Sequence, residues 1–82
     1  MSETVFPVYR QYRGGASPFR IESPDRFVEL KDIRNAWLNF EIFAQTYPEK
    51  LFILDLINFG GPQIMDLNKE DFEKAEMLSK RV

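Results

Sequence analysis

Apolar residues are densest between Thr46 and Gly61, and their spacing there predicts an α-helix. Five of them share one broad arc of a helical wheel: Phe52, Ile53, Leu56, Ile57 and Phe59. An arc of this width is typical of a helix face that packs on a core. The rest of the chain can be placed around this helix.

Both ends of the helix carry sequence signals. Thr46 and Glu49 have the spacing of a capping box, and Pro48 lies in the first turn, where a missing N–H costs little. Gly60 and Gly61 follow the last apolar residue, and glycine favours the left-handed conformation that ends helices. Start and stop signals therefore agree on roughly three turns.

Leu51 and Leu54 fall on the opposite side of the wheel, together with Asp55 and Asn58. Two leucines are more apolar residues than a solvent-facing side of a helix usually carries. One interpretation is that a loop or the second helix covers them. The other is an exposed apolar patch that binds another protein, which is the usual meaning of such a patch.

Residues 5–22 have the pattern of a β-hairpin. Phe6 and Val8 share one face of the first strand, Phe19 and Ile21 share one face of the second, and turn-forming residues occupy positions 14–18. Pro7 cannot donate a hydrogen bond to a sheet, so we expect the first strand to lie at an edge or to have a free N–H side there.

Residues 26–33 and 36–44 alternate with period 2 around an Arg34-Asn35 turn, which predicts two further strands. In the second of these, Trp37 and Phe43 fall on the otherwise polar face. A helix is the alternative for residues 33–47, because several apolar residues there also recur every three or four positions. The density of aromatic and β-branched residues favours the strand.

Residues 62–67 predict a fifth, short strand. Asn68 is a good N-cap, and Leu67 and Phe72 have the spacing of a hydrophobic staple, so a second helix is expected over residues 69–81. The apolar residues that this helix would bury are Phe72, Ala75, Leu78 and Val82.

The pattern thus predicts a single compact α+β domain over residues 1–82. Its element order is ββββαβα, with a small antiparallel sheet of about four strands plus a short fifth and two helices packed on one face. The opposite face would be open or covered by a partner, and a homodimer through it would use the surplus of apolar residues.

The amino-acid composition excludes several kinds of catalytic and metal-binding site. The 82 residues include no cysteine and no histidine, which excludes thiolate catalysis, a Ser-His-Asp triad and the usual zinc ligands. A net charge of −2 gives no whole-chain reason to expect nucleic-acid binding. Long apolar runs and secretory-signal features are not seen, which favours a cytoplasmic protein without a membrane partner. We expect a protein that has no enzymatic activity and binds no cofactor or metal.

Three features could carry a function. From Val5 to Ile21 the N-terminal hairpin combines arginines with tyrosines and lacks acids, which suits single-stranded RNA, a protein interface or simply a soluble edge. Acidic residues between positions 66 and 76 could mimic phosphates, or could stabilise the second helix. Asp55 could be a buried acid, although the wheel favours solvent. The hairpin residues concerned are Tyr9, Arg10, Tyr12, Arg13 and Arg20.

The sequence therefore favours a small non-enzymatic protein that binds another protein, as an inhibitor or adaptor of a larger machine such as a nucleic-acid-processing enzyme. RNA binding through the hairpin is the alternative. The predicted protein interface consists of Tyr9, Tyr12, Trp37, Phe43, Leu51 and Leu54.

Overall fold

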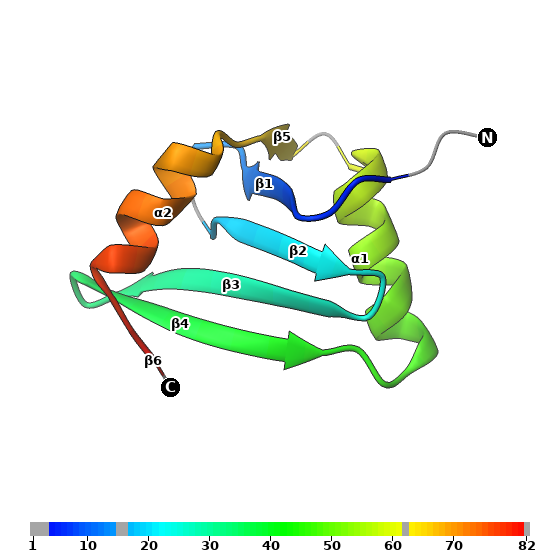
Figure 1. Ribbon diagram of the computed structural model, residues 1–82, viewed down its shortest axis with the longest axis horizontal. Coiled ribbons are helices and arrows are strands. Elements are labelled where there is room, and N and C mark those ends of the chain that lie inside the picture. The colour runs from blue at the N-terminus through cyan, green and yellow to red at the C-terminus, as the bar shows by residue number, and fades with distance from the viewer. Residues whose placement is uncertain (1–3, 15–16, 62, 82) are drawn as a thin grey trace.

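The computed structural model describes residues 4–14, 17–61 and 63–81, with only the backbone of Arg81, and its strands form one six-stranded sheet (Figure 1). The order across the sheet is β5-β1-β2-β3-β4-β6, and the neighbouring strands are antiparallel except for β4 and β6. The elements are β1 (Val8–Tyr12), β2 (Phe19–Ser23), β3 (Arg26–Ile33), β4 (Ala36–Phe43), α1 (Tyr47–Asn58), β5 (Ile64–Asp66), α2 (Lys69–Met77) and β6 (Ser79–Arg81). The predicted α+β class and the order ββββαβα are confirmed, and β6 is added.

The two helices pack on opposite faces of the sheet, which corrects the prediction that they share one face. Ile53 and Leu56 of α1 lie in a cluster with Phe27, whereas Phe72 of α2 packs with Val28. Phe27 and Val28 are consecutive residues of β3, so they point to opposite faces, and both are buried. Because each face carries buried apolar residues, each face needs its own helix, and neither is left wholly open.

β1 is an interior strand, so of the two arrangements expected from Pro7 the edge position is wrong. It pairs with β2 on one side and with β5 on the other. Pro7 precedes the strand, so its missing N–H removes no hydrogen bond from either ladder.

Residues 36–43 form β4, which decides against the helical alternative. The turn before it has positive φ at Arg34 and Asn35, 54° and 63°, the two-residue geometry that matches the twist of a hairpin. The register pairs Asp32 with Trp37 and Val28 with Glu41. Trp37 therefore lies on the α2 side of the sheet, the same face as Glu41, where it packs against the cluster around Phe72.

The predicted capping box of α1 is present. The Thr46 hydroxyl accepts a hydrogen bond from the Glu49 backbone N–H, and the Glu49 carboxylate accepts one from the Thr46 N–H. At the other end Phe59, not glycine, adopts the left-handed conformation (φ 54°). A Cβ on Gly60 would lie 2.6 Å from the Asp55 Oδ1 atom, so the exposed Asp55 side chain would have to move to admit one.

The second helix is shorter than predicted. It ends at Met77, and Ser79–Arg81 form β6, which pairs parallel to Trp37–Asn39 of β4. The edge of β4 supplies backbone partners that residues 79–81 would otherwise find within a helix. Leu78 is consequently 73% exposed rather than buried, and Ala75 is half-buried. The predicted burial of Val82 falls outside the described residues.

Candidate protein-interaction surface

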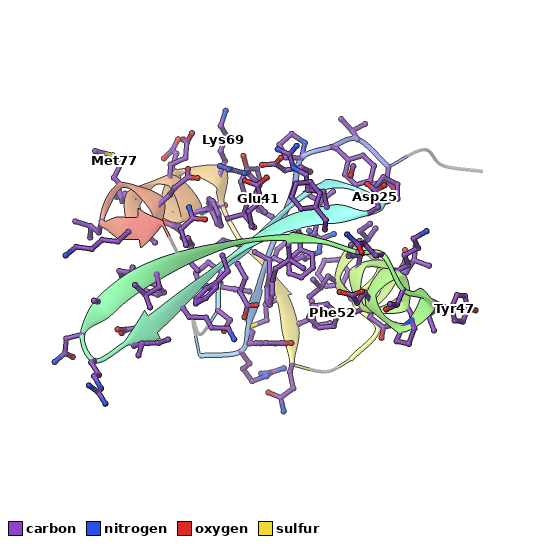
Figure 2. The ribbon with its side chains drawn as sticks, turned by 90° about the horizontal axis from the view of Figure 1, so that it is seen from below. Asp25, Glu41, Tyr47, Phe52, Lys69 and Met77 are labelled. Atoms are coloured by element: carbon purple, nitrogen blue, oxygen red, sulfur yellow. The ribbon has the colours of Figure 1, made fainter. Side chains whose placement is uncertain are left out.

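The outer face of α1 is an exposed apolar surface. Tyr47 is 72% exposed, Leu51 41% and Leu54 46%, so the interpretation that a loop or helix covers the two leucines is wrong for the described residues. Figure 2 shows Tyr47 directed away from the sheet and Phe52 on the opposite side of the helix, toward it. We define the α1 outer stripe as six exposed residues of this helix: Tyr47, Lys50, Leu51, Leu54, Asp55 and Asn58.

The other predicted interface residues divide into two groups. Tyr9 and Trp37 are half-buried against the cluster around Phe72, and Tyr12 packs edge-on against Phe19 with ring centroids 5.4 Å apart. Burial, and to a lesser degree the charge of Glu29, raises the pKa of the Tyr12 phenol. These three side chains contribute to the core.

Phe43, at the end of β4, is 55% exposed. The Arg26 guanidinium carbon lies 5.7 Å from the centre of its ring. Phe43 is the last residue of β4 and precedes the first residue of α1, Tyr47, by four positions.

Arg10 binds the C-terminal end of α1. Its guanidinium donates hydrogen bonds to the carbonyl oxygens of Leu56 (3.0 Å) and Ile57 (3.0 Å), and its carbon lies 4.0 Å from the centre of the Phe59 ring. It also pairs with Asp66 at 2.8 Å. Burial lowers the pKa of the Arg10 guanidinium, and the Asp66 carboxylate opposes this shift. A cation at a helix C-terminus satisfies carbonyls that have no partner within the helix.

Arg20 is held by acidic residues of this chain. Its guanidinium makes two contacts of 2.9 Å with the Glu76 carboxylate of α2 and one of 3.1 Å with Glu22. Burial lowers the pKa of Arg20, but the hydrogen bonds and charges of Glu76 and Glu22 outweigh it and raise that pKa overall. Glu22 also pairs with Arg26, which lies 3.8 Å from Glu41. A ladder of alternating charges thus crosses the sheet.

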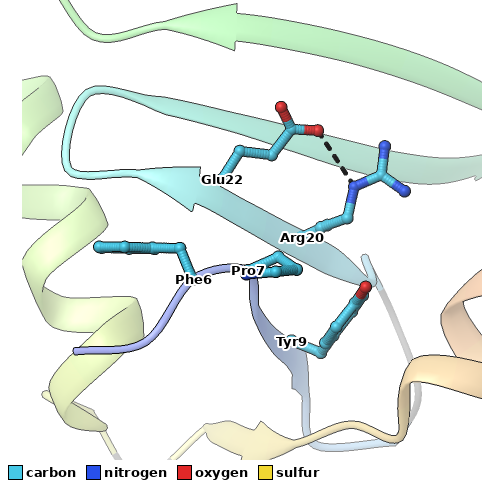
Figure 3. A pocket seen from close by; sticks show the side chains of 5 residues that line it. All are labelled: Phe6, Pro7, Tyr9, Arg20 and Glu22. Carbon is cyan, nitrogen blue, oxygen red and sulfur yellow. Dashed lines mark hydrogen bonds and ion pairs between the residues drawn. The ribbon is translucent and has the colours of Figure 1, made fainter.

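A shallow hollow of about 380 Å³ lies beside this ladder (Figure 3). It is lined by Phe6, Pro7, Tyr9, Arg20 and Glu22. Of these residues only Tyr9 and Arg20 were predicted from the sequence as functional candidates. On one side of the hollow the Arg20 guanidinium donates a hydrogen bond to the Glu22 carboxylate. The hollow therefore has aromatic sides and a polar wall whose charges are already paired.

The acidic residues between positions 66 and 76 differ in their contacts. Glu76 binds Arg20 and Asp66 binds Arg10, whereas Glu70, Asp71 and Glu73 are exposed on α2. Asp55 is exposed, as the helical wheel predicted. Within residues 4–14, 17–61 and 63–81, His, Cys, Asp and Glu side chains form no cluster of metal-ligand geometry.

Sequence reasoning did not single out Tyr47 and Lys50 as surface residues of interest. Their signal is the spacing of Leu51 and Leu54 continued by one turn toward the N-terminus. Neither helix in the described part of the chain is long and apolar enough to cross a membrane.

The fold and this surface define a small α+β domain with one helix on each sheet face and an apolar outer stripe on α1. Comparisons with protein-family models, with curated proteins and with solved structures found no match for the chain.

Proposed function

We propose that this protein is a non-enzymatic binding protein, an adaptor or inhibitor, that contacts another protein chain through the outer face of α1. The supporting observation is that Tyr47, Leu51 and Leu54 are exposed together on one side of a helix whose other side is firmly packed. Exposed apolar side chains at helical spacing suit a groove or helix of a partner, into which they can insert.

The polar surroundings of these residues support the same proposal. Lys50 and Asp55 are exposed beside the two leucines, and Asn58 continues the stripe at its C-terminal end. An apolar centre with a polar rim is the usual composition of a protein interface.

The hairpin gives less support to RNA binding than the sequence suggested. Arg10 and Arg20 bind carbonyl and carboxylate groups of this chain, so a phosphate would have to displace those partners. Tyr9 and Tyr12 pack against Phe72 and Phe19, which limits the ring surface that a base could stack on.

We expect no saturable binding of single-stranded RNA at low salt. Fluorescence anisotropy of a labelled oligonucleotide, titrated with the protein, measures this directly. Binding that weakens steeply as salt is raised would show that phosphate contacts dominate, and would restore the hairpin as the functional surface.

Replacing Leu51 with aspartate should abolish partner binding while the domain stays folded. Leu51 is 41% exposed, so the change should lower the free energy of unfolding by about 1 kcal/mol or less. A desolvated charge at the centre of an apolar contact should weaken binding by at least about a hundredfold. Chemical cross-linking in the native host, followed by purification of the tagged protein, compares the variants.

Met77→Asp is the matched control, because Met77 is 86% exposed and lies on α2 (Figure 2). We expect proteins recovered with the wild type to be recovered with Met77→Asp and lost with Leu51→Asp. The same set recovered with all three chains would show that the outer face of α1 is not the binding surface.

A further inference from the structure

The α1 outer stripe has the spacing of a two-stranded coiled-coil seam. Tyr47, Leu51, Leu54 and Asn58 are separated by four, three and four residues, so they form one line along the helix. Lys50 and Asp55 lie on either side of this line. A charged residue just before one seam position and another just after the next are typical of helices that pair with a second helix.

We infer that the occupant of the α1 outer stripe is a second copy of this chain, paired through α1 in parallel orientation about a two-fold axis. This inference deepens the proposed function, on which it rests, by naming the partner of the same surface. A two-fold contact uses the same residues on both protomers, so the stripe must complement itself.

The two flanking charges complement themselves in the parallel arrangement. Lys50 and Asp55 are five residues apart, which is the offset between a flanking residue of one helix and its neighbour on a parallel partner. Lys50 would lie beside the partner's Asp55, and by symmetry Asp55 beside the partner's Lys50. In an antiparallel pair each charge would instead lie near its own copy, which is repulsive. The charge pattern therefore selects the parallel pair.

Asn58 supports the same orientation. It continues the seam as a polar residue, and a parallel pair brings it against the partner's Asn58, where the two amides can hydrogen-bond. In the part of the chain that the structure describes, no side-chain hydrogen bond or ion pair is seen for Lys50, Asp55 or Asn58. All three are exposed, so they are available to a partner.

The contact is short, which sets the expected affinity. α1 has 12 residues, about three turns, so the buried area falls in the range of weak and transient interfaces. We expect dimers at micromolar to millimolar protein concentration, in rapid exchange with monomers.

The charge pattern is tested by reversing each charge and then both. Lys50→Glu creates two repulsive contacts in place of two attractive ones and should weaken the dimer about tenfold; Asp55→Lys should do the same. The double variant Lys50→Glu/Asp55→Lys restores opposite charges and should recover the dimer. It also moves the acid toward the helix N-terminus and the base toward the C-terminus, which the helix dipole favours, so it should fold well. Sedimentation equilibrium measures the association.

A single engineered thiol tests the orientation, because the chain has no cysteine of its own. In the parallel pair Asn58→Cys faces its own copy and should form a disulfide under mild oxidation faster than Met77→Cys, an exposed control on α2. In an antiparallel pair centred on the leucines the two positions would lie about 16 Å apart and could not bond.

The outcomes separate this inference from the proposed function. A chain that stays monomeric at millimolar concentration, but loses its cross-linked partners through Leu51→Asp, overturns the second copy and leaves the binding surface in place. If Leu51→Asp and both single charge reversals leave the dimer affinity unchanged, the dimer forms through another surface and the inference is overturned. A charge-reversal loss that the double variant recovers, with rapid Asn58→Cys cross-linking, establishes it.

Discussion

Replacing Phe72 with alanine is expected to release α2 and β6 from the sheet while the rest of the domain stays folded. Phe72 is fully buried and is the one buried residue of α2, all of whose residues are described. Its ring lies 5.6 Å from that of Tyr9 and 5.0 Å below the Arg20 guanidinium carbon. Truncation of a buried phenylalanine costs about 3–5 kcal/mol, which the few other contacts of a nine-residue helix cannot offset.

Hydrogen exchange distinguishes local release from global unfolding. In Phe72→Ala, amides of residues 69–81 should lose protection while those of α1 and β2 keep most of theirs. Phe19→Ala is the matched comparison, because Phe19 is equally buried but contacts the rings of Tyr12, Phe27 and Phe52 in the cluster beneath α1. It should reduce protection throughout. If Phe72→Ala also does so, α2 is not a separable unit.

Replacing Arg10 with alanine is expected to lower the free energy of unfolding by about 3 kcal/mol, because it leaves the carbonyls of Leu56 and Ile57 without their partner. It also removes the guanidinium that lies on the Phe59 ring. The Arg10 side chain is only 13% exposed, so water cannot readily replace these contacts. Urea denaturation followed by circular dichroism measures the loss.

Two further variants separate the contacts of Arg10. Asp66 is 82% exposed, so Asp66→Asn should cost less than about 1 kcal/mol. Arg10→Lys keeps the charge but lacks the planar fork that reaches both carbonyls, and should recover little of the lost stability. Equal losses in Asp66→Asn and Arg10→Ala would mean that the ion pair, and not the helix end, is what Arg10 stabilises.

The position of α1 on the sheet connects Arg10 to the proposed binding surface. Arg10 belongs to β1, an interior strand, and holds the last turn of the helix that carries the α1 outer stripe. The inner side of the same helix is held by Ile53 and Leu56. A helix fixed at its inner face and its C-terminal end presents its outer residues in one orientation, which lowers the cost of ordering them on binding.

Local signals in the sequence were sufficient for most elements. The capping box at Thr46 and Glu49 places the start of α1, because its hydrogen bonds join residues three apart. Period-2 alternation places β3 and β4, because neighbouring side chains of a strand point to opposite faces. The helical wheel likewise separates the buried Ile53 and Leu56 from the exposed Leu51 and Leu54.

Other features depend on partners that are distant in the sequence. Arg10 and Arg20 resembled a nucleic-acid-binding set because the groups that hold them, Leu56 and Glu76, lie 46 and 56 residues away. Residues 79–81 have the sequence pattern of a helix end, but in the folded chain they pair with the edge of β4 as a strand.

The sequence by itself determined the α+β class, the order of the elements up to the second helix, and an amphipathic α1 with leucines on its outer side. The tertiary structure decided that each sheet face receives one helix, that Tyr47, Leu51 and Leu54 on the outer side of α1 are exposed, and that two hairpin arginines bind within the chain. The physical reason is that hydrophobic periodicity records which side chains need burial, whereas the element that buries them is selected by packing the whole chain.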